Sequence, residues 1–310
     1  MKLQEMLGIK YPFIQGGMAH IATGEFAAAV SMAGGLGLIG AGGMTAEELA
    51  VHIDYLEERT DKPFGVNLML MNPYADEMAD LLIEKKVPIV TTGAGNPAKY
   101  IDKWKEAGMK VFPVVPNPSL ALRMERLGVD GVIAEGSEAG GHIGQMTTMT
   151  LIPQVVDRVS IPVIAAGGIA SGKQMLACEM LGAVGFQLGT ILLATTECPV
   201  HENFKEKLMK SNDTQVTVIG NRCGIPIRLL KNEMTREYLE KENEGWDKYQ
   251  LEEFTLGALR KAVHEGDITR GSLMAGLTVG QIRDVVSVEE RMEQLYSEYL
   301  KEKSAFKNGN

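Results

Sequence analysis

The chain has 310 residues, a formal net charge of −9 and 45% apolar residues, which is enough for a large buried core. The acidic balance excludes a general nucleic-acid-binding protein, which needs a basic face, and no apolar run reaches the roughly 18 residues of a membrane span. Three widely spaced cysteines (Cys178, Cys198 and Cys223) and an N-terminus without a signal-peptide core predict a reduced, cytoplasmic protein without a cysteine-based metal site.

Short apolar runs alternate with amphipathic stretches up to about residue 195. Eight of these runs are continuously apolar, as expected for parallel strands that are covered on both faces. They are Phe13–Ile14, Leu36–Ile39, Phe64–Leu70, Val87–Thr91, Lys110–Val115, Gly131–Ala134, Ile161–Ala165 and Gly185–Leu188. Helical patterns follow seven of them, at 27–32, 46–58, 74–85, 98–107, 119–127, 152–159 and 172–181.

Eight strand-then-helix units predict an α/β fold of the (βα)8 TIM-barrel type over residues 1–199. The alternative is a doubly wound open sheet, which the count of eight and the lack of an N-terminal GxGxxG fingerprint disfavour.

The pattern changes after Leu193. Residues 200–283 are more charged, have few strand signals and show helical patterns at 201–209, 233–244 and 251–265. They predict a smaller, mostly helical subdomain on the substrate side of the barrel. Residues 284–310 contain an amphipathic helix from Val288 to Lys301, which is expected to return to the barrel.

TIM-barrel active sites lie at the carboxyl ends of the strands, so six segments are expected to line one mouth. They are Gln15–Met18, Asn67, Thr91–Pro97, Glu135–Gly144, Ala166–Ile169 and Gln187–Thr190.

The segments that follow the seventh and eighth strands are where TIM barrels often bind phosphate, with backbone N–H groups and a helix N-terminus. Gly167 and Gly168 would leave space for the anion, Gly189 and Thr190 would close the other side, and Ser171 would cap the following helix. The alternative is that these glycines only form tight turns.

The segment Glu135-Gly-Ser-Glu-Ala-Gly-Gly-His142-Ile-Gly144 combines four glycines with one histidine. Glycine allows a close approach of backbone to a ligand, and histidine titrates near neutral pH. His142 is therefore the candidate for proton transfer, although it could merely bond to a loop. Glu135 follows a strand directly and could contact a ligand, as could Asn67, because asparagine is depleted inside strands. His20 is a weaker candidate at the same mouth.

Several of these segments resemble a known family. They are Ile14-Gln-Gly-Gly-Met18, Gly65-Val-Asn67, Thr91-Thr-Gly-Ala-Gly-Asn-Pro97, Glu135-Gly-Ser-Glu-Ala-Gly-Gly-His142, Ala165-Ala-Gly-Gly-Ile169 and Gly189-Thr190. The chain is similar, from about residue 5 to 300, to the flavin-dependent enoyl-acyl carrier protein reductases of type II, which are related to the nitronate monooxygenases. The Glu-Ala-Gly-Gly-His segment is typical of the combined superfamily, whereas Thr-Thr-Gly-Ala-Gly-Asn-Pro favours the reductase branch.

The resemblance implies FMN in the barrel mouth and NADH or NADPH as co-substrate, with a monovalent-cation requirement left open. The implied FMN-binding residues are Gly17, Met18, Asn67 and Glu135 at the ring, Gly167, Gly168, Gly189 and Thr190 at the phosphate, and Gln187. The implied reaction transfers hydride from the nicotinamide through flavin N5 to the β-carbon of an enoyl thioester in type II fatty-acid biosynthesis. His142 would donate the α-proton or polarise the thioester carbonyl.

The resemblance also implies a homodimer and an acidic partner, acyl carrier protein. A local basic cluster of Arg222, Arg228, Lys231 and Arg236 could steer that partner, bind the nucleotide phosphates, or be ordinary solvated surface.

One departure concerns a late Ala-Gly-Gln segment of the family, where this chain has Met274-Ala-Gly-Leu277 and the next glutamine is Gln281. Two other functions stay open: an oxygen-dependent nitronate monooxygenase, which would use the same flavin site and histidine, and a non-catalytic flavin- or phosphate-binding barrel.

Overall fold

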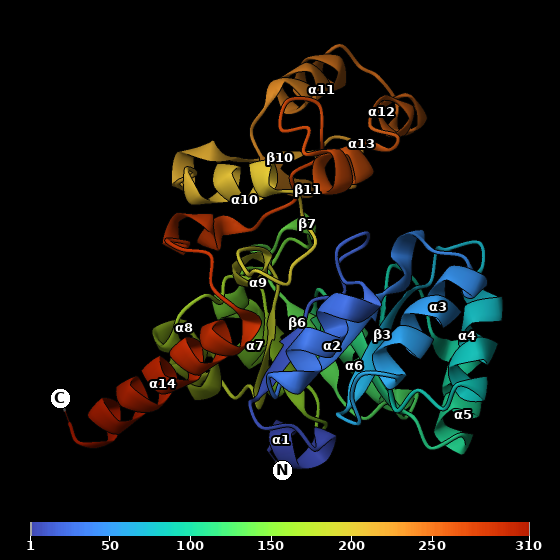
Figure 1. Cartoon of the computed structure of the whole chain (residues 1–310), viewed down its shortest axis with the longest axis vertical. Helices are drawn as coiled ribbons and strands as arrows, with labels where there is room; N and C mark the ends of the chain where they lie inside the picture. Colours follow the sequence, from blue (N-terminus) through green and yellow to red (C-terminus); the bar gives the residue numbers. More distant parts are fainter. Residues whose placement is uncertain (1, 310) are drawn as a thin grey trace.

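The computed structural model describes residues 2–309 and contains a barrel of eight parallel strands (Figure 1). The strands are β1 (Phe13–Gln15), β2 (Gly37–Gly40), β3 (Phe64–Met69), β4 (Ile89–Gly93), β5 (Lys110–Val115), β6 (Val132–Glu135), β8 (Val163–Ala166) and β9 (Gly185–Leu188). They pair in the order β1-β9-β8-β6-β5-β4-β3-β2, and a parallel bridge between Ile14 and Leu36 joins the two ends of the sheet. The predicted TIM barrel is confirmed, and the open-sheet alternative is wrong.

Helices surround the barrel. They are α2 (Gly24–Met32), α3 (Ala46–Glu57), α4 (Ala75–Glu84), α5 (Ala98–Glu106), α6 (Pro118–Arg126), α7 (Thr148–Val156), α8 (Gly172–Met180) and α14 (Val288–Lys307). Helix α14 contacts both α8 and α2, so it occupies the eighth position of the ring, and it runs beyond its predicted end. Local sequence sets several helix starts: Thr45 forms a capping box with Glu48, and Ser171 caps α8 as predicted.

The barrel interior is filled by apolar side chains from alternate strand positions, such as Ile14, Phe112 and Ile164, which are fully buried. The short helix α1 (Leu3–Leu7), which the sequence analysis did not predict, adds Leu3 to the same cluster. Helix α1 therefore closes the amino-terminal end of the barrel. The opposite, carboxyl-terminal end of the strands forms the mouth, where the predicted site residues lie.

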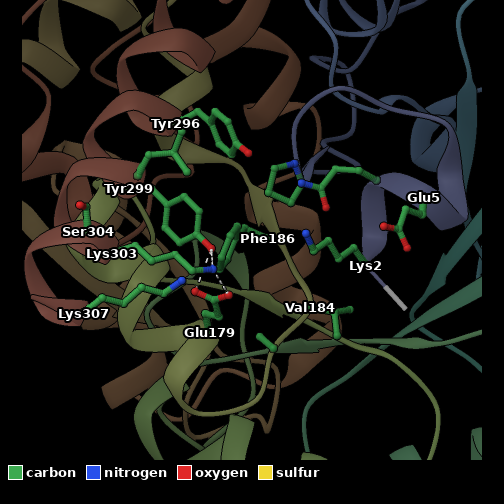
Figure 2. Close-up of a pocket in the computed structure, with 14 residues that line it drawn as sticks. Lys2, Glu5, Glu179, Val184, Phe186, Tyr296, Tyr299, Lys303, Ser304 and Lys307 are labelled. Carbon is green, nitrogen blue, oxygen red and sulfur yellow. Dashed lines mark hydrogen bonds and ion pairs between the residues drawn. The ribbon is translucent and has the colours of Figure 1, made fainter.

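A groove of about 670 Å³ lies beside α1, between the amino-terminal ends of β1 and β9 and helix α14 (Figure 2). Tyr299 donates a hydrogen bond of 2.8 Å to Glu179 there, and Lys303 contacts both side chains. This groove is at the end of the barrel opposite the mouth and contains none of the predicted site residues.

Most residues between β9 and α14 form an outer layer beyond the mouth (Figure 1). Its helices are α9 (Thr190–Leu193), α10 (Glu202–Met209), α11 (Glu233–Asn243), α12 (Lys248–Phe254) and α13 (Ala258–Arg260), and a π-helical turn follows at Lys261–Glu265. The chain leaves the barrel at Thr195 and returns beside it at Val286, where the two residues form a parallel bridge. Within residues 2–309, no helix has the length and apolar character needed to cross a membrane.

The same layer contains a small antiparallel sheet that the sequence analysis missed. Strands β10 (Val216–Ile219) and β11 (Ile227–Leu230) form a hairpin, and β7 (Gly141–His142) from the glycine-rich loop pairs with β11. The continuous helix predicted at 251–265 is also interrupted, because α12 ends at Phe254 and Gly257 has a left-handed backbone. The layer is thus helical around a sheet that reaches back to the mouth.

Candidate active site

His142 lies on β7, with Ile227 of β11 opposite it in the antiparallel register. Its side chain is exposed, and the surrounding protein desolvates the ring enough to lower its pKa, although Glu252 opposes this effect. An imidazole with a lowered pKa is neutral at neutral pH and carries one N–H donor. His142 is therefore a neutral hydrogen-bond donor on the small sheet beyond the mouth.

Glu135 ends β6 and lies level with Ala166 of β8, which in turn lies level with Gln187 of β9. Burial raises the pKa of Glu135 to about 7, and no charge or hydrogen bond from residues 2–309 counters this desolvation. The carboxyl group thus lacks a partner within the described protein. Gln187 is also largely buried, and its side chain shows no hydrogen bond within the same residues.

Asn67 connects the ends of three strands. Its Oδ1 accepts a 2.8 Å hydrogen bond from Thr91 of β4, and its Nδ2 is 3.5 Å from the carbonyl oxygen of Gly17, after β1. A Cβ at Gly17 would be 2.3 Å from the Asn67 side chain, so only glycine permits this approach. Met18 is next in the chain and partly exposed. The Asn67 amide is therefore fixed by Thr91 and Gly17 at the carboxyl ends of the strands, and its side chain remains partly accessible to a ligand.

Backbone N–H groups from two neighbouring loops are free at the mouth. Gly167 and Gly168 have φ values of +87° and +75°, a conformation that favours glycine. The N–H groups of Gly168, Gly189 and Thr190 find no acceptor within residues 2–309. Thr190 begins the short helix α9, which stands where TIM barrels add a short helix at the phosphate site. We call this set of N–H groups the N–H cradle.

Helix α8 takes a smaller part in the N–H cradle than expected. The N–H of Gly172 donates to a Glu298 carboxylate oxygen of α14 at 2.9 Å, and the N–H of Gln174 donates to the Ser171 hydroxyl. Its first turn is therefore largely satisfied within the protein.

The segment that departs from the family pattern does reach the mouth. The N–H of Gly276 donates to Thr190 Oγ1 at 2.8 Å, and the N–H of Leu277 donates to the carbonyl oxygen of Glu138 at 3.0 Å. Residues 276 and 277 therefore contact both the N–H cradle and the loop of residues 136–144 that carries His142, called the histidine loop. Gln281 is exposed at the end of the following 3-10 helix. A local sequence pattern could not reveal this role, because the contacts join residues far apart in the chain.

Glu138, to which the sequence gave no role, caps α7. Its carboxylate accepts from the N–H of Thr148 at 2.8 Å and from the Thr148 hydroxyl at 3.0 Å. His20 has a left-handed backbone (φ +61°), and its ring centre is 6.0 Å from that of His264 in the π-helical turn. The loop after β1, which contains His20, therefore contacts the outer layer above the mouth.

The four basic residues of the predicted cluster have different surroundings. Arg228 is half-buried on β11 and donates from Nε to the carbonyl oxygen of Ser137 at 3.0 Å. Arg222 and Lys231 are exposed, although each also donates to backbone carbonyls. Arg236 is exposed on α11. Only three of the four therefore offer charge to an approaching partner.

Comparison with known proteins identifies the family. The sequence matches the family model described as nitronate monooxygenase over residues 1–82 and 73–298. The chain belongs to the nitronate monooxygenase family. It is 36% identical to a probable nitronate monooxygenase of Staphylococcus saprophyticus, over 87% of this chain and 90% of that protein. Membership in this family indicates that the protein is an oxidoreductase.

Two solved structures are similar over nearly their whole length. FabK from Thermotoga maritima shares 46% identity with a TM-score of 0.96, covering 99% of this chain and 98% of that one. A nitroalkane oxidase from Streptomyces ansochromogenes shares 27% identity with a TM-score of 0.88, covering 98% and 99%. The fold and length of this chain are thus shared with both proteins.

The family implies a flavin, and the mouth fits FMN on three observations. The N–H cradle offers donors to a phosphate. Gly189 has nothing within 4 Å of an added Cβ, which leaves open space beside the N–H cradle. The polar groups of Glu135 and Asn67 face the mouth on the barrel side, where a flavin ring would need hydrogen-bonding partners.

Proposed function

We propose that the protein is an FMN-dependent enoyl-acyl carrier protein reductase, an oxidoreductase acting on a CH–CH bond. The observation that carries this proposal is the 46% identity to FabK over 99% of the chain, because the motifs at the mouth also favour the reductase branch. The overall reaction consumes an enoyl thioester, NAD(P)H and one proton, and yields the saturated thioester and NAD(P)⁺. When bound, FMN supplies the hydride relay between the nicotinamide and the β-carbon.

The chain's own residues would bind, orient and protonate. The N–H cradle would hold the FMN phosphate, and Asn67 and Glu135 would contact the ring. His142, neutral and exposed, would donate its N–H to the thioester carbonyl and so stabilise the negative charge that develops as hydride arrives at the β-carbon. Glu135 has a pKa of about 7, so its carboxyl group is protonated in part of the molecules at neutral pH. In that form it can also donate a hydrogen bond to a ligand in the mouth.

Acyl carrier protein would approach the outer layer over Arg222, Lys231 and Arg236, which are exposed. Because that attraction is screened by salt, the KM for an acyl carrier protein substrate is expected to rise with ionic strength. The KM for a short acyl-CoA should respond less, and an unchanged KM for the carrier substrate would contradict docking through these residues.

A second candidate is a nitronate monooxygenase, which the names of relatives such as the Staphylococcus saprophyticus protein favour. Steady-state assays of the flavin-loaded protein separate the two. A reductase oxidises NADH or NADPH much faster when crotonyl thioester is present, yields the saturated thioester, and consumes little oxygen with an alkyl nitronate. Nitronate-dependent oxygen uptake without enoyl reduction would overturn the proposal, and no turnover in either assay would leave a binding protein.

A further inference from the structure

The loop that carries His142 has few side-chain anchors of its own. It contains four glycines between 136 and 144, and β7 has only two residues. Within residues 2–309 the small sheet has the order β10-β11-β7, in which β7 pairs with β11 alone. A strand of this length is not stable alone. Glu138 is anchored to α7 and to Leu277, and the part of the loop that contains His142 pairs with β11, so the direction of the His142 side chain depends in part on β11.

Strand β11 holds the loop at two places. At one, β7 pairs with β11, and the N–H of Ile143 donates to the carbonyl oxygen of Pro226 at 3.1 Å. At the other, Arg228 reaches back and donates from Nε to the carbonyl oxygen of Ser137 at 3.0 Å. Ser137 is also where the loop closes, since its N–H donates to Met146 at 2.8 Å.

The surroundings of Arg228 favour a role within the protein over a role in attracting a partner. Its side chain is half-buried, and desolvation lowers its pKa, while the nearby carboxylate of Glu138 opposes that effect. Removing a guanidinium from water is costly unless it gains strong hydrogen bonds, and one to a carbonyl oxygen compensates part of that cost. A cation that serves only to attract a distant partner would gain more from full exposure, as Arg236 has.

We propose that Arg228 is a positioning residue, which fixes the loop of residues 137–142 through the Ser137 carbonyl and thereby aims His142 at the reacting thioester. The catalytic part of this inference rests on the proposed function, whereas the structural part does not. It also removes Arg228 from the surface that receives acyl carrier protein.

The test uses Arg228→Met, which keeps the length of the apolar stem but cannot donate, and Arg228→Lys, which keeps the charge. The control is Arg158→Met, which removes an exposed arginine just after α7. Misplacing a catalytic group by about 1 Å costs up to about 100-fold. Arg228→Met is therefore expected to lower kcat about 10- to 100-fold, with crotonyl-CoA and with the carrier-bound substrate alike, and with little change in KM. Arg228→Lys should recover part of the loss.

Hydrogen–deuterium exchange of the full-length protein gives a readout that does not need turnover. Arg228→Met should speed exchange of the Ile143 amide at least about tenfold, while Arg158→Met leaves it unchanged. A rise in KM for the carrier substrate alone would make Arg228 a docking cation and overturn the proposal. So would unchanged exchange in Arg228→Met. If the wild-type protein does not reduce enoyl thioesters, the proposed function fails, and exchange alone decides the positioning role.

Discussion

The buried carboxyl of Glu135 should make the stability of the flavin-free protein depend on pH in an unusual direction. Its folded-state pKa is about 7, against an ordinary value of 4.5, because burial disfavours the charged form. Between about pH 4.5 and 7, the folded protein therefore keeps a proton that the unfolded chain has lost. The free energy of unfolding falls as pH rises through this window and then levels off above the folded pKa.

The magnitude follows from the same two values. At 1.36 kcal/mol per pKa unit, the difference between 4.5 and about 7 corresponds to about 3 kcal/mol. This is an upper bound, since the side chain retains some contact with water at the mouth. Glu135→Gln removes the titration, so it should flatten this part of the pH dependence. Above about pH 8 it should be more stable than the wild type by up to about 3 kcal/mol.

Urea unfolding of the flavin-free protein at a series of pH values measures this directly, with Glu106→Gln as control, because Glu106 is exposed at the end of α5. The control should follow the wild type. Parallel curves for the wild type and Glu135→Gln would refute the reasoning, because they would mean that the Glu135 carboxyl keeps an ordinary pKa in the folded protein.

Three further substitutions test the mouth. His142→Ala should retain flavin, seen as the yellow absorbance of the purified protein, but lose at least about tenfold in turnover; a fully active variant would remove His142 from the mechanism. Gly17→Ala places a Cβ 2.3 Å from the Asn67 side chain and should cost about 1–3 kcal/mol of stability by urea denaturation, and an unchanged midpoint would contradict the geometry. Gly276→Ala places a Cβ 2.5 Å from the Glu138 carbonyl oxygen and should reduce turnover at least about tenfold; normal kinetics would show that the histidine loop tolerates the shift.

The barrel could be predicted from the sequence because its signals are local. Each buried parallel strand is a short apolar run followed by a helical pattern, and the caps at Thr45 and Ser171 depend on neighbouring residues. Mouth residues such as Asn67 and Glu135 followed from the rule that sites lie at the carboxyl ends of strands. Their use in binding stays a prediction.

The outer layer could not be predicted in the same way, because its organisation depends on contacts between distant residues. Strand β7 exists only through β11, about 85 residues later, and its two residues carry no strand signal of their own. The hairpin of Val216–Ile219 and Ile227–Leu230 does carry a local signal, since Val216-Thr-Val-Ile219 is a run of β-branched residues, but its pairing with β7 depends on residues far away in the chain. The contact between Gly276 and Thr190 likewise appears only in three dimensions.

The central claim is that the flavin is reduced by a pyridine nucleotide and reoxidised by an enoyl thioester. Anaerobic addition of NADH or NADPH to the flavin-loaded protein tests the first half by the loss of the yellow absorbance, and addition of crotonyl thioester to the bleached protein tests the second. We expect rapid bleaching with one of the nucleotides and return of the colour with the thioester. No bleaching by either nucleotide, together with turnover of an alkyl nitronate in air, would contradict the proposed function.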